Sequence, residues 1–107
     1  MNGIVSLNEE NFEEAVQGKL AFVLFSADWC GLCSHFAPVM ESLADEFDGK
    51  VLFGTVDVDQ NRELAETFQS KSIPNCYILK DGKVVKQFVG TKDKANKAVL
   101  KQELEDV

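Results

Sequence analysis

Apolar residues occur along the chain in blocks with two different spacings, one typical of strands and one typical of helices. Leu20–Phe25 is a continuous apolar run rich in β-forming residues, which predicts a strand buried on both faces. Val51–Val58 predicts a second buried strand. Between them, Cys30–Phe47 carries apolar residues at helical spacing and is followed by Asp48-Gly49, which predicts a long helix. Its apolar positions are Phe36, Val39, Met40, Leu43, Ala44 and Phe47.

Shorter helices are expected before the first of these strands and after the second. Asn8 is followed by two glutamates, which is typical of a helix start, because asparagine caps the first turn and acids suit the positive end of the helix dipole. Gly18 is expected to end that helix. After the second strand, Asn61 or Asp59 can cap a short helix that carries Leu64, Ala65 and Phe68.

The C-terminal third of the chain predicts a hairpin and a last helix. Cys76–Leu79 and Val84–Val89 flank Asp81-Gly82, a strong signal for a tight turn between two strands. Asp93–Val107 is expected to be helical, with its apolar positions facing inward. Those positions are Val99, Leu100, Leu104 and Val107.

The order of these elements predicts one α/β domain over residues 1–107. A short strand near the start is followed by alternating helices and strands, which favours parallel pairing, and the terminal hairpin adds antiparallel strands. The expected architecture is a central mixed five-stranded sheet flanked by helices on both faces. We expect no linker and no second domain.

Charge and composition exclude several classes of function. The formal net charge of −7 argues against binding to nucleic acid or to anionic membranes, both of which need clustered lysine and arginine. No stretch approaches the roughly 20 apolar residues of a membrane span, and the first residues do not form a signal peptide. The three cysteines are too few for a secreted disulfide scaffold. We therefore expect a cytoplasmic protein.

The candidate chemistry lies in Trp29-Cys30-Gly31-Leu32-Cys33, which follows the first buried strand and opens the long helix. If Cys30 is the N-cap, its sulfur faces unpaired N–H groups, which lowers the thiol pKa and favours the reactive thiolate. Cys33 lies about one turn further on, close enough to close a disulfide with Cys30. Gly31 leaves room for a substrate chain, and Trp29 is expected to border the site.

Two other interpretations of the cysteine pair remain open from the residues alone. The pair could be half of a zinc site, although zinc usually needs four ligands and only Cys76, His35 and acids remain as candidates. It could also be an inert structural pair. We expect Cys76 to be a buried core thiol and His35 to be a solvated helix residue.

Six segments of the chain together resemble the thioredoxin family along nearly its whole length. They are Phe25–Cys33, Ala37-Pro38, Val56–Asn61, Ile73-Pro74, Asp81-Gly82 and Val89-Gly90. The resemblance implies the thioredoxin fold and a thiol–disulfide oxidoreductase that reduces protein disulfides. In that reaction Cys30 attacks a substrate disulfide and Cys33 resolves the mixed disulfide. The resemblance also implies a cis Ile73–Pro74 bond and a substrate groove formed by Trp29, Gly31, Leu32, Ile73, Pro74, Val89 and Gly90.

The same resemblance implies the partners and cofactors of the reaction. We expect no bound cofactor and no metal, since the redox-active disulfide itself carries the electrons. Client proteins with disulfides would be the acceptors, and a flavin-dependent thioredoxin reductase would be the donor, with the protein acting as a monomer in electron transport and cell redox homeostasis. A more oxidising, isomerase-like relative and a non-catalytic docking module are the alternatives.

Five positions depart from the usual pattern of the family, one of them Ser26, where an aromatic residue is common. Leu32 replaces the proline between the two cysteines, and Ser34 replaces a basic residue. Leu24 and Thr55 stand where the family usually carries a buried aspartate and a lysine, a pair thought to help deprotonate the resolving cysteine. We therefore expect Cys33 to react more slowly than is usual, and we expect the disulfide to be less reducing.

Overall fold

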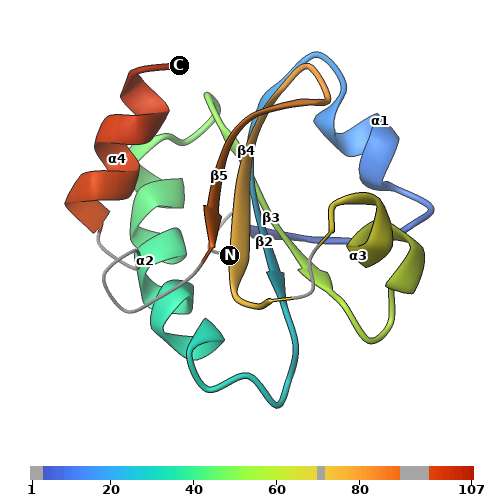
Figure 1. Ribbon diagram of the computed structural model, residues 1–107. Helices are drawn as coiled ribbons and strands as arrows, with labels where there is room; N and C mark the ends of the chain where they lie inside the picture. The colour runs from blue at the N-terminus through green and yellow to red at the C-terminus, as the bar shows by residue number, and fades with distance from the viewer. Residues whose placement is uncertain (1–3, 70–71, 90–96) are drawn as a thin grey trace.

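The computed structural model describes residues 4–69, 72–89 and 97–107. They form a five-stranded sheet in the order β1-β3-β2-β4-β5, with helices between the strands (Figure 1). In chain order the elements are β1 Ile4–Leu7, α1 Phe12–Val16, β2 Leu20–Ser26, α2 Cys33–Glu46, β3 Leu52–Asp57, α3 Arg62–Thr67, β4 Asn75–Lys80, β5 Lys83–Val89 and α4 Lys97–Glu105. The mixed five-stranded sheet expected from the sequence is confirmed.

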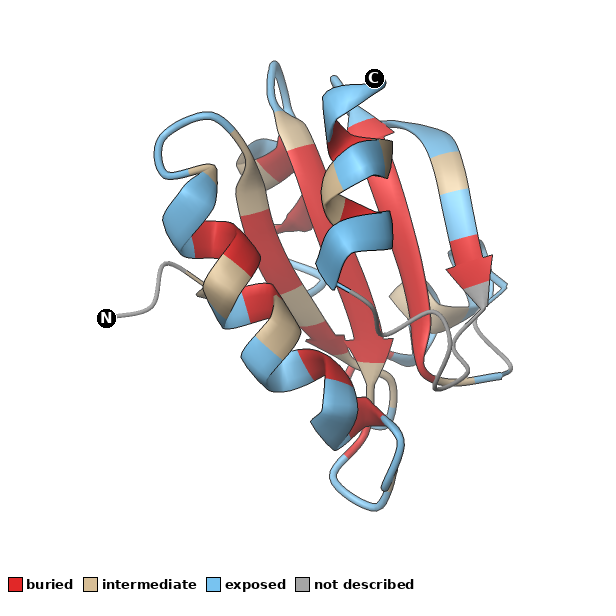
Figure 2. Ribbon diagram, turned by 90° about the vertical axis from the view of Figure 1, so that its left-hand side faces the viewer, coloured by how far each residue is buried: buried red, intermediate tan, exposed pale blue. Residues whose placement is uncertain are grey.

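The sheet separates two helical layers, with α2 and α4 on one face and α1 and α3 on the other (Figure 1). The central strand β2 supplies the core of both layers, because successive side chains of a strand point to opposite faces. Phe22 and Leu24 belong to the core cluster under α2 and α4, whereas Val23 and Phe25 belong to the cluster under α1 and α3. Figure 2 shows that the central strands behind α2 and α4 are buried along most of their length, whereas the edge strand β5 is mostly exposed.

Strand pairing brings three distant segments to one end of the sheet. β1, β3 and β2 are parallel, while β4 pairs antiparallel with β2 and β5 pairs antiparallel with β4. Phe25, near the end of β2, lies opposite Asn75, and Asn75 in turn lies opposite Val89. The loop that follows β2, the residues that precede β4 and the end of β5 therefore meet at the same end of the sheet.

Two helix starts lie later in the chain than the sequence pattern predicts. α1 begins at Phe12, because the Asn8 side chain accepts hydrogen bonds from the N–H groups of Glu10 and Asn11 and closes a separate turn first. α2 begins at Cys33 with Leu32 as its N-cap, so the prediction that Cys30 is the N-cap is wrong.

The last helix also differs from the expected pattern. Residues 93–96 lie outside the described residues, and α4 is described from Lys97 onward. Leu100 and Leu104 are buried as expected, but Val99 is 42% exposed, so its predicted inward position is wrong. Because Leu100 and Leu104 are one turn apart, they form a narrow stripe that leaves the neighbouring position at the surface.

Gly54 of β3 is a position where any side chain would collide with the core. A Cβ atom built there would lie 2.9 Å from Cγ of Leu7, a residue that is 1% exposed. We expect Gly54→Ala to lower the free energy of unfolding by about 1–3 kcal/mol, the usual effect of overpacking. Urea denaturation would measure this. Gly31→Ala is the matched control, since nothing lies within 4 Å of its Cβ, and an equal loss in both variants would contradict the packing argument.

Candidate active site

The two candidate cysteines lie where the loop after β2 enters α2. Cys30 and Cys33 are joined in a disulfide with their Cα atoms 5.4 Å apart. Cys33 is the first residue of α2 and is 7% exposed, whereas Cys30 is only partly buried and stands on the loop. Cys30 is therefore the more exposed of the two cysteines.

One backbone N–H at the start of α2 points toward the sulfur of Cys30. The N–H of Cys33 donates to Cys30 Sγ over 3.2 Å, so the sulfur takes up one of the unpaired donors of the helix start although Cys30 is not the N-cap. The hydroxyl of Ser34 donates to the Gly31 carbonyl over 2.6 Å, and His35 N–H donates to the Leu32 carbonyl over 3.1 Å. These bonds hold the four-residue cysteine loop against the first turn of the helix.

Large apolar side chains next to the cysteines are open to solvent. Trp29 is 69% exposed and Leu32 is 39% exposed, which is unusual for such side chains and is typical of a contact surface. The indole Nε1 of Trp29 donates to Asp59 Oδ2 over 2.8 Å, which holds the ring in one orientation. From the sequence pattern, Asp59 is expected only as a possible cap of α3. Its contact with Trp29 joins the loops after β2 and β3, and no local signal indicates it.

The structure brings Ile73-Pro74 to the same end of the sheet as the disulfide loop. The Ile73–Pro74 peptide bond is cis, which confirms that expectation. Pro74 is buried and Ile73 is partly exposed, and both precede Asn75, the partner of Phe25 in β2. Val89 ends β5 opposite Asn75. Gly90, also predicted to line the groove, lies outside the described residues.

A buried polar network holds the strand that follows Pro74. Asn75 is 2% exposed, and its amide donates to the hydroxyl of Tyr77 over 3.1 Å. The amide of Gln87 donates to the same hydroxyl over 3.1 Å, and the hydroxyl itself donates to the carbonyl of Phe68. Buried polar groups need such partners, so this network fixes β4 against both β5 and the end of α3. The sequence pattern did not indicate it, because the partners are far apart along the chain.

The middle of the strand that leads to the disulfide loop is buried among uncharged residues. Leu24 is 3% exposed and lies in register between Thr55 of β3 and Cys76 of β4. It belongs to the same buried cluster as Phe36 of α2, three residues beyond Cys33. Burial raises the pKa of the Cys76 thiol, so Cys76 is a neutral core residue at physiological pH, as expected. None of these three β-strand residues provides a carboxylate or an ammonium group.

The described residues offer no second kind of site of the types expected to hold a metal or to cross a membrane. Within residues 4–69, 72–89 and 97–107, no group of three or more histidine, cysteine, aspartate or glutamate residues is placed to hold a metal ion. His35 is exposed on the first turn of α2. None of the described helices has the length and apolar character needed to cross a membrane.

Comparison with known proteins identifies the family. The thioredoxin family model matches residues 3–105. A thioredoxin of Staphylococcus haemolyticus is 42% identical over 95 residues, which cover 89% of this chain and 91% of the relative. A thioredoxin of Chlamydia pneumoniae is 40% identical over 88 residues, which cover 82% of this chain and 85% of the relative. A chain that matches this family over nearly its whole length, and whose Cys30 and Cys33 form a disulfide, belongs to the thioredoxin family and is a thiol–disulfide oxidoreductase that reduces protein disulfides.

Proposed function

We propose that Cys30 is the attacking thiol and Cys33 the resolving thiol of this reductase. The Cys30 thiolate attacks one sulfur of a substrate disulfide, forms a mixed disulfide and releases the other substrate sulfur as a thiolate. Cys33 then loses its proton and attacks Cys30, which frees the second substrate thiol and leaves the Cys30–Cys33 disulfide. The difference in burial between the two residues supports this assignment, since Cys33 is buried at the start of α2 and Cys30 is only partly buried.

The apolar surface around the disulfide is proposed to hold the substrate chain. Trp29 and Leu32 are exposed beside Cys30, and Gly31 leaves the loop open, with nothing within 4 Å of a Cβ built there. Ile73-Pro74 and the end of β5 at Val89 would form the opposite border of this groove. An extended substrate segment could pair with the backbone before β4, a short form of strand addition. Recognition through backbone groups would suit a reductase with many client proteins.

The family implies substrates with disulfides and a reductase as electron donor. We propose that the donor is a flavin-dependent thioredoxin reductase and that the chain works as a monomeric single domain over residues 1–107. We also propose that it acts in the cytoplasm, in electron transport, with no bound cofactor. The cysteines support the cytoplasmic location. They form one disulfide and one buried thiol, not the scaffold of several disulfides that is typical of small secreted proteins.

Alkylation of the reduced protein tests the roles of the cysteines. With iodoacetamide in limiting amount near neutral pH, we expect Cys30 to be labelled first, because its sulfur is accessible and faces the start of α2. Cys76 should be labelled last, since burial raises its pKa. Peptide mapping by mass spectrometry would give the order. Earlier labelling of Cys33 or Cys76 would reverse the assignment, and a turnover assay on a protein disulfide would test the activity itself.

Leu32→Pro tests how the unusual residue between the cysteines affects the redox potential. Leu32 has φ −67°, which proline can adopt, so the change chiefly removes the backbone N–H of a residue that lies between the two cysteines. An N–H that stabilises the thiolate stabilises the reduced form, and a hydrogen bond to a charged group is worth about 1.5–3 kcal/mol at most. We expect Leu32→Pro to make the potential more negative by up to about 60 mV, measured against glutathione, since about 30 mV corresponds to about 1.4 kcal/mol. An unchanged or higher potential would contradict this argument.

A further inference from the structure

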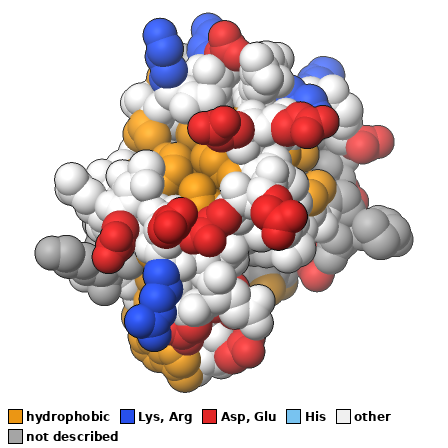
Figure 3. Space-filling model, turned by 90° about the vertical axis from the view of Figure 1, so that its right-hand side faces the viewer, with side chains coloured by type: hydrophobic (Ala, Val, Ile, Leu, Met, Phe, Trp, Pro, Cys, Tyr) orange, Lys and Arg blue, Asp and Glu red, His pale blue; other side chains and the backbone are white. Residues whose placement is uncertain are grey.

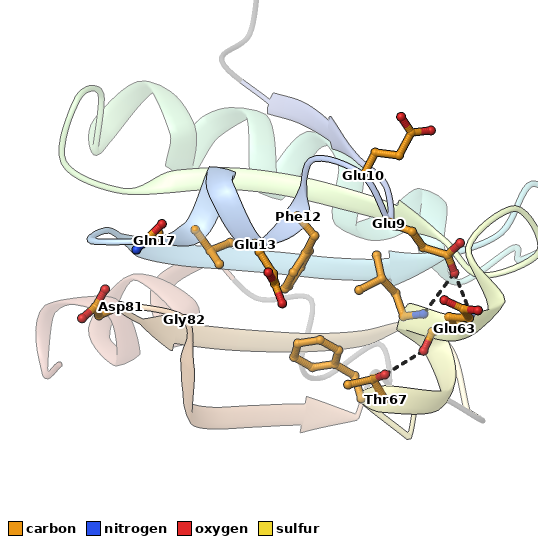
Figure 4. Close-up of a pocket in the computed structure, with 12 residues that line it drawn as sticks. Glu9, Glu10, Phe12, Glu13, Gln17, Glu63, Thr67, Asp81 and Gly82 are labelled. Atoms are coloured by element: carbon orange, nitrogen blue, oxygen red, sulfur yellow. Dashed lines mark hydrogen bonds between the residues drawn. The ribbon is translucent and has the colours of Figure 1, made fainter.

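Apart from the proposed substrate groove, a hollow lies on the sheet face that α1 and α3 cover. Its volume is about 540 Å³, a size typical of ligand-binding clefts. α1, α3 and the turn between β4 and β5 surround it (Figure 4). None of the described residues that line it belongs to Trp29–Cys33 or to Ile73-Pro74. The proposed redox function therefore leaves this hollow unexplained.

The floor of the hollow is apolar and aromatic. Phe12 and Val16 of α1 lie on one side, and Leu64 and Phe68 from α3 and its C-cap lie on the other. The rings of Phe12 and Phe68 meet edge to face with their centroids 5.2 Å apart. Leu64 and Phe68 are only partly buried, so part of this apolar surface stays in contact with water. Figure 3 shows it as an apolar patch in the middle of this face.

Carboxylates surround the apolar floor. The residues that line the hollow include five acids and no lysine, arginine or histidine. The acids are Glu9, Glu10, Glu13, Glu63 and Asp81. Among the described residues, the ion pairs involve other acids, Glu46 and Glu103, so the charges around the hollow are not neutralised there. Figure 3 shows acidic side chains bordering the apolar patch.

Hydrogen bonds hold the walls of the hollow in place. Glu9 Oε2 accepts from the N–H groups of Glu63 over 2.7 Å and Leu64 over 3.3 Å, so it ties the segment before α1 to the start of α3 (Figure 4). On the opposite side, Asp81 Oδ1 accepts from Gly18 N–H over 2.6 Å, which ties the β4–β5 turn to the end of α1. A preformed hollow of this kind loses little conformational entropy when it is occupied.

We propose that this hollow is a docking site for a segment of a partner protein in which apolar side chains are flanked by lysine or arginine. The apolar side chains would cover Leu64 and Phe68, and the basic residues would meet the carboxylates around them. Charge complementarity decides against a second copy of this chain as the occupant, because two copies would each carry a net charge of −7. The proposal is independent of the disulfide chemistry and does not rest on the roles proposed for Cys30 and Cys33.

A synthetic peptide tests the proposal directly. The probe is an N-acetylated, C-amidated hexapeptide with two central leucines and two lysines on each side, titrated into the isotope-labelled protein and followed by NMR. We expect saturable shifts at the amides of Phe12, Leu64 and Phe68, with a Kd below about 1 mM. Replacing the leucines by serine, or the lysines by glutamate, should each weaken binding at least about fivefold, since both kinds of contact contribute.

A matched pair of variants separates the hollow from general attraction to an acidic protein. Glu13 lines the hollow, whereas its exposed neighbour Glu14 does not, and both lie in the first turn of α1. Glu13→Lys should weaken peptide binding about fivefold, and Glu14→Lys should change it less than about twofold. Glu13→Gln, which only removes the charge, should give an intermediate effect.

Several results would overturn the proposal. Equal effects of Glu13→Lys and Glu14→Lys would mean that net charge alone attracts the peptide. Shifts centred on Trp29 and Leu32 would place the peptide on the redox surface instead. A molar mass that rises with protein concentration, together with amide shifts at Leu64 and Phe68, would mean that a second copy of the chain occupies the hollow. The absence of saturable binding would remove the site altogether.

Discussion

Replacing Cys33 with serine should abolish turnover and leave Cys30 covalently joined to its substrate. The serine hydroxyl cannot attack the mixed disulfide, so the first step proceeds and the second stops. Multiple turnover should fall by about a thousandfold or more, the scale on which loss of a covalent nucleophile acts. Cys33 is 7% exposed at the start of α2, so no solvent thiol of similar proximity replaces it.

The trapped species can be measured directly. Incubation of the reduced Cys33→Ser variant with a disulfide-containing protein should give a stable adduct on non-reducing gels, which dithiothreitol releases. Cys76→Ala is the matched control, because Cys76 is the third cysteine and is buried in the core; it should retain turnover and form no lasting adduct. A Cys33→Ser variant that still turns over, or an adduct that maps to Cys76, would contradict the proposed roles.

The second large effect is expected from Leu24→Asp. In the family pattern a buried aspartate at this position is thought to help deprotonate the resolving cysteine, and Leu24 lies 3% exposed in the cluster that also holds Phe36 of α2. We expect collapse of the Cys30 mixed disulfide to become about tenfold faster or more, since a positioned base contributes roughly 10²–10⁴-fold in other reactions. The variant should also lose about 3–5 kcal/mol of stability, because it removes a core side chain and buries a carboxyl group.

The pH dependence of the second step distinguishes a base from a packing change. Burial raises the pKa of a carboxyl group, and only its ionised form accepts a proton, so the added rate should appear as pH rises through that pKa. Leu24→Asn is the matched control, with a side chain of the same shape and no ionisable group. Stopped-flow measurement of mixed-disulfide collapse gives both rates. If Leu24→Asn accelerates the step as much as Leu24→Asp does, proton transfer is not the cause.

The central strands and the cysteine pair could be predicted from the sequence because their signals are local. An unbroken apolar run such as Leu20–Phe25 leaves no polar face for water, so it predicts a strand buried on both sides, and the structure confirms this. Cys30 and Cys33 are three residues apart at a strand-to-helix junction, a spacing that by itself keeps their sulfurs within reach of one another. Asp81-Gly82 likewise predicts its turn, with both residues at positive φ.

Helix ends were predicted less well, because their caps depend on contacts between distant residues. The pattern offers Asn61 or Asp59 as the side-chain cap of α3, but the Asn61 side chain accepts from Glu9 N–H and donates to the Asp57 carbonyl, and Asp59 accepts from Trp29. Glu9, far away in the chain, supplies the carboxylate that caps α3. The choice between these partners depends on how close the segment before α1 comes to α3, which only the folded sheet determines.

The close cysteine pair and the order of strands and helices therefore follow from the amino-acid sequence, since each is set by neighbouring residues or by periodicity, whereas the reaction was implied by the resemblance to the thioredoxin family. The contacts between distant segments, and the surfaces that these contacts form, are known only from the folded structure. In that structure Ile73-Pro74 lies at the same end of the sheet as the disulfide loop, and Trp29 donates a hydrogen bond to Asp59. The fold also encloses an apolar floor with acids from three separate segments. Such contacts depend on strand register and helix packing, which bring together residues whose separation along the chain leaves no pattern in the sequence.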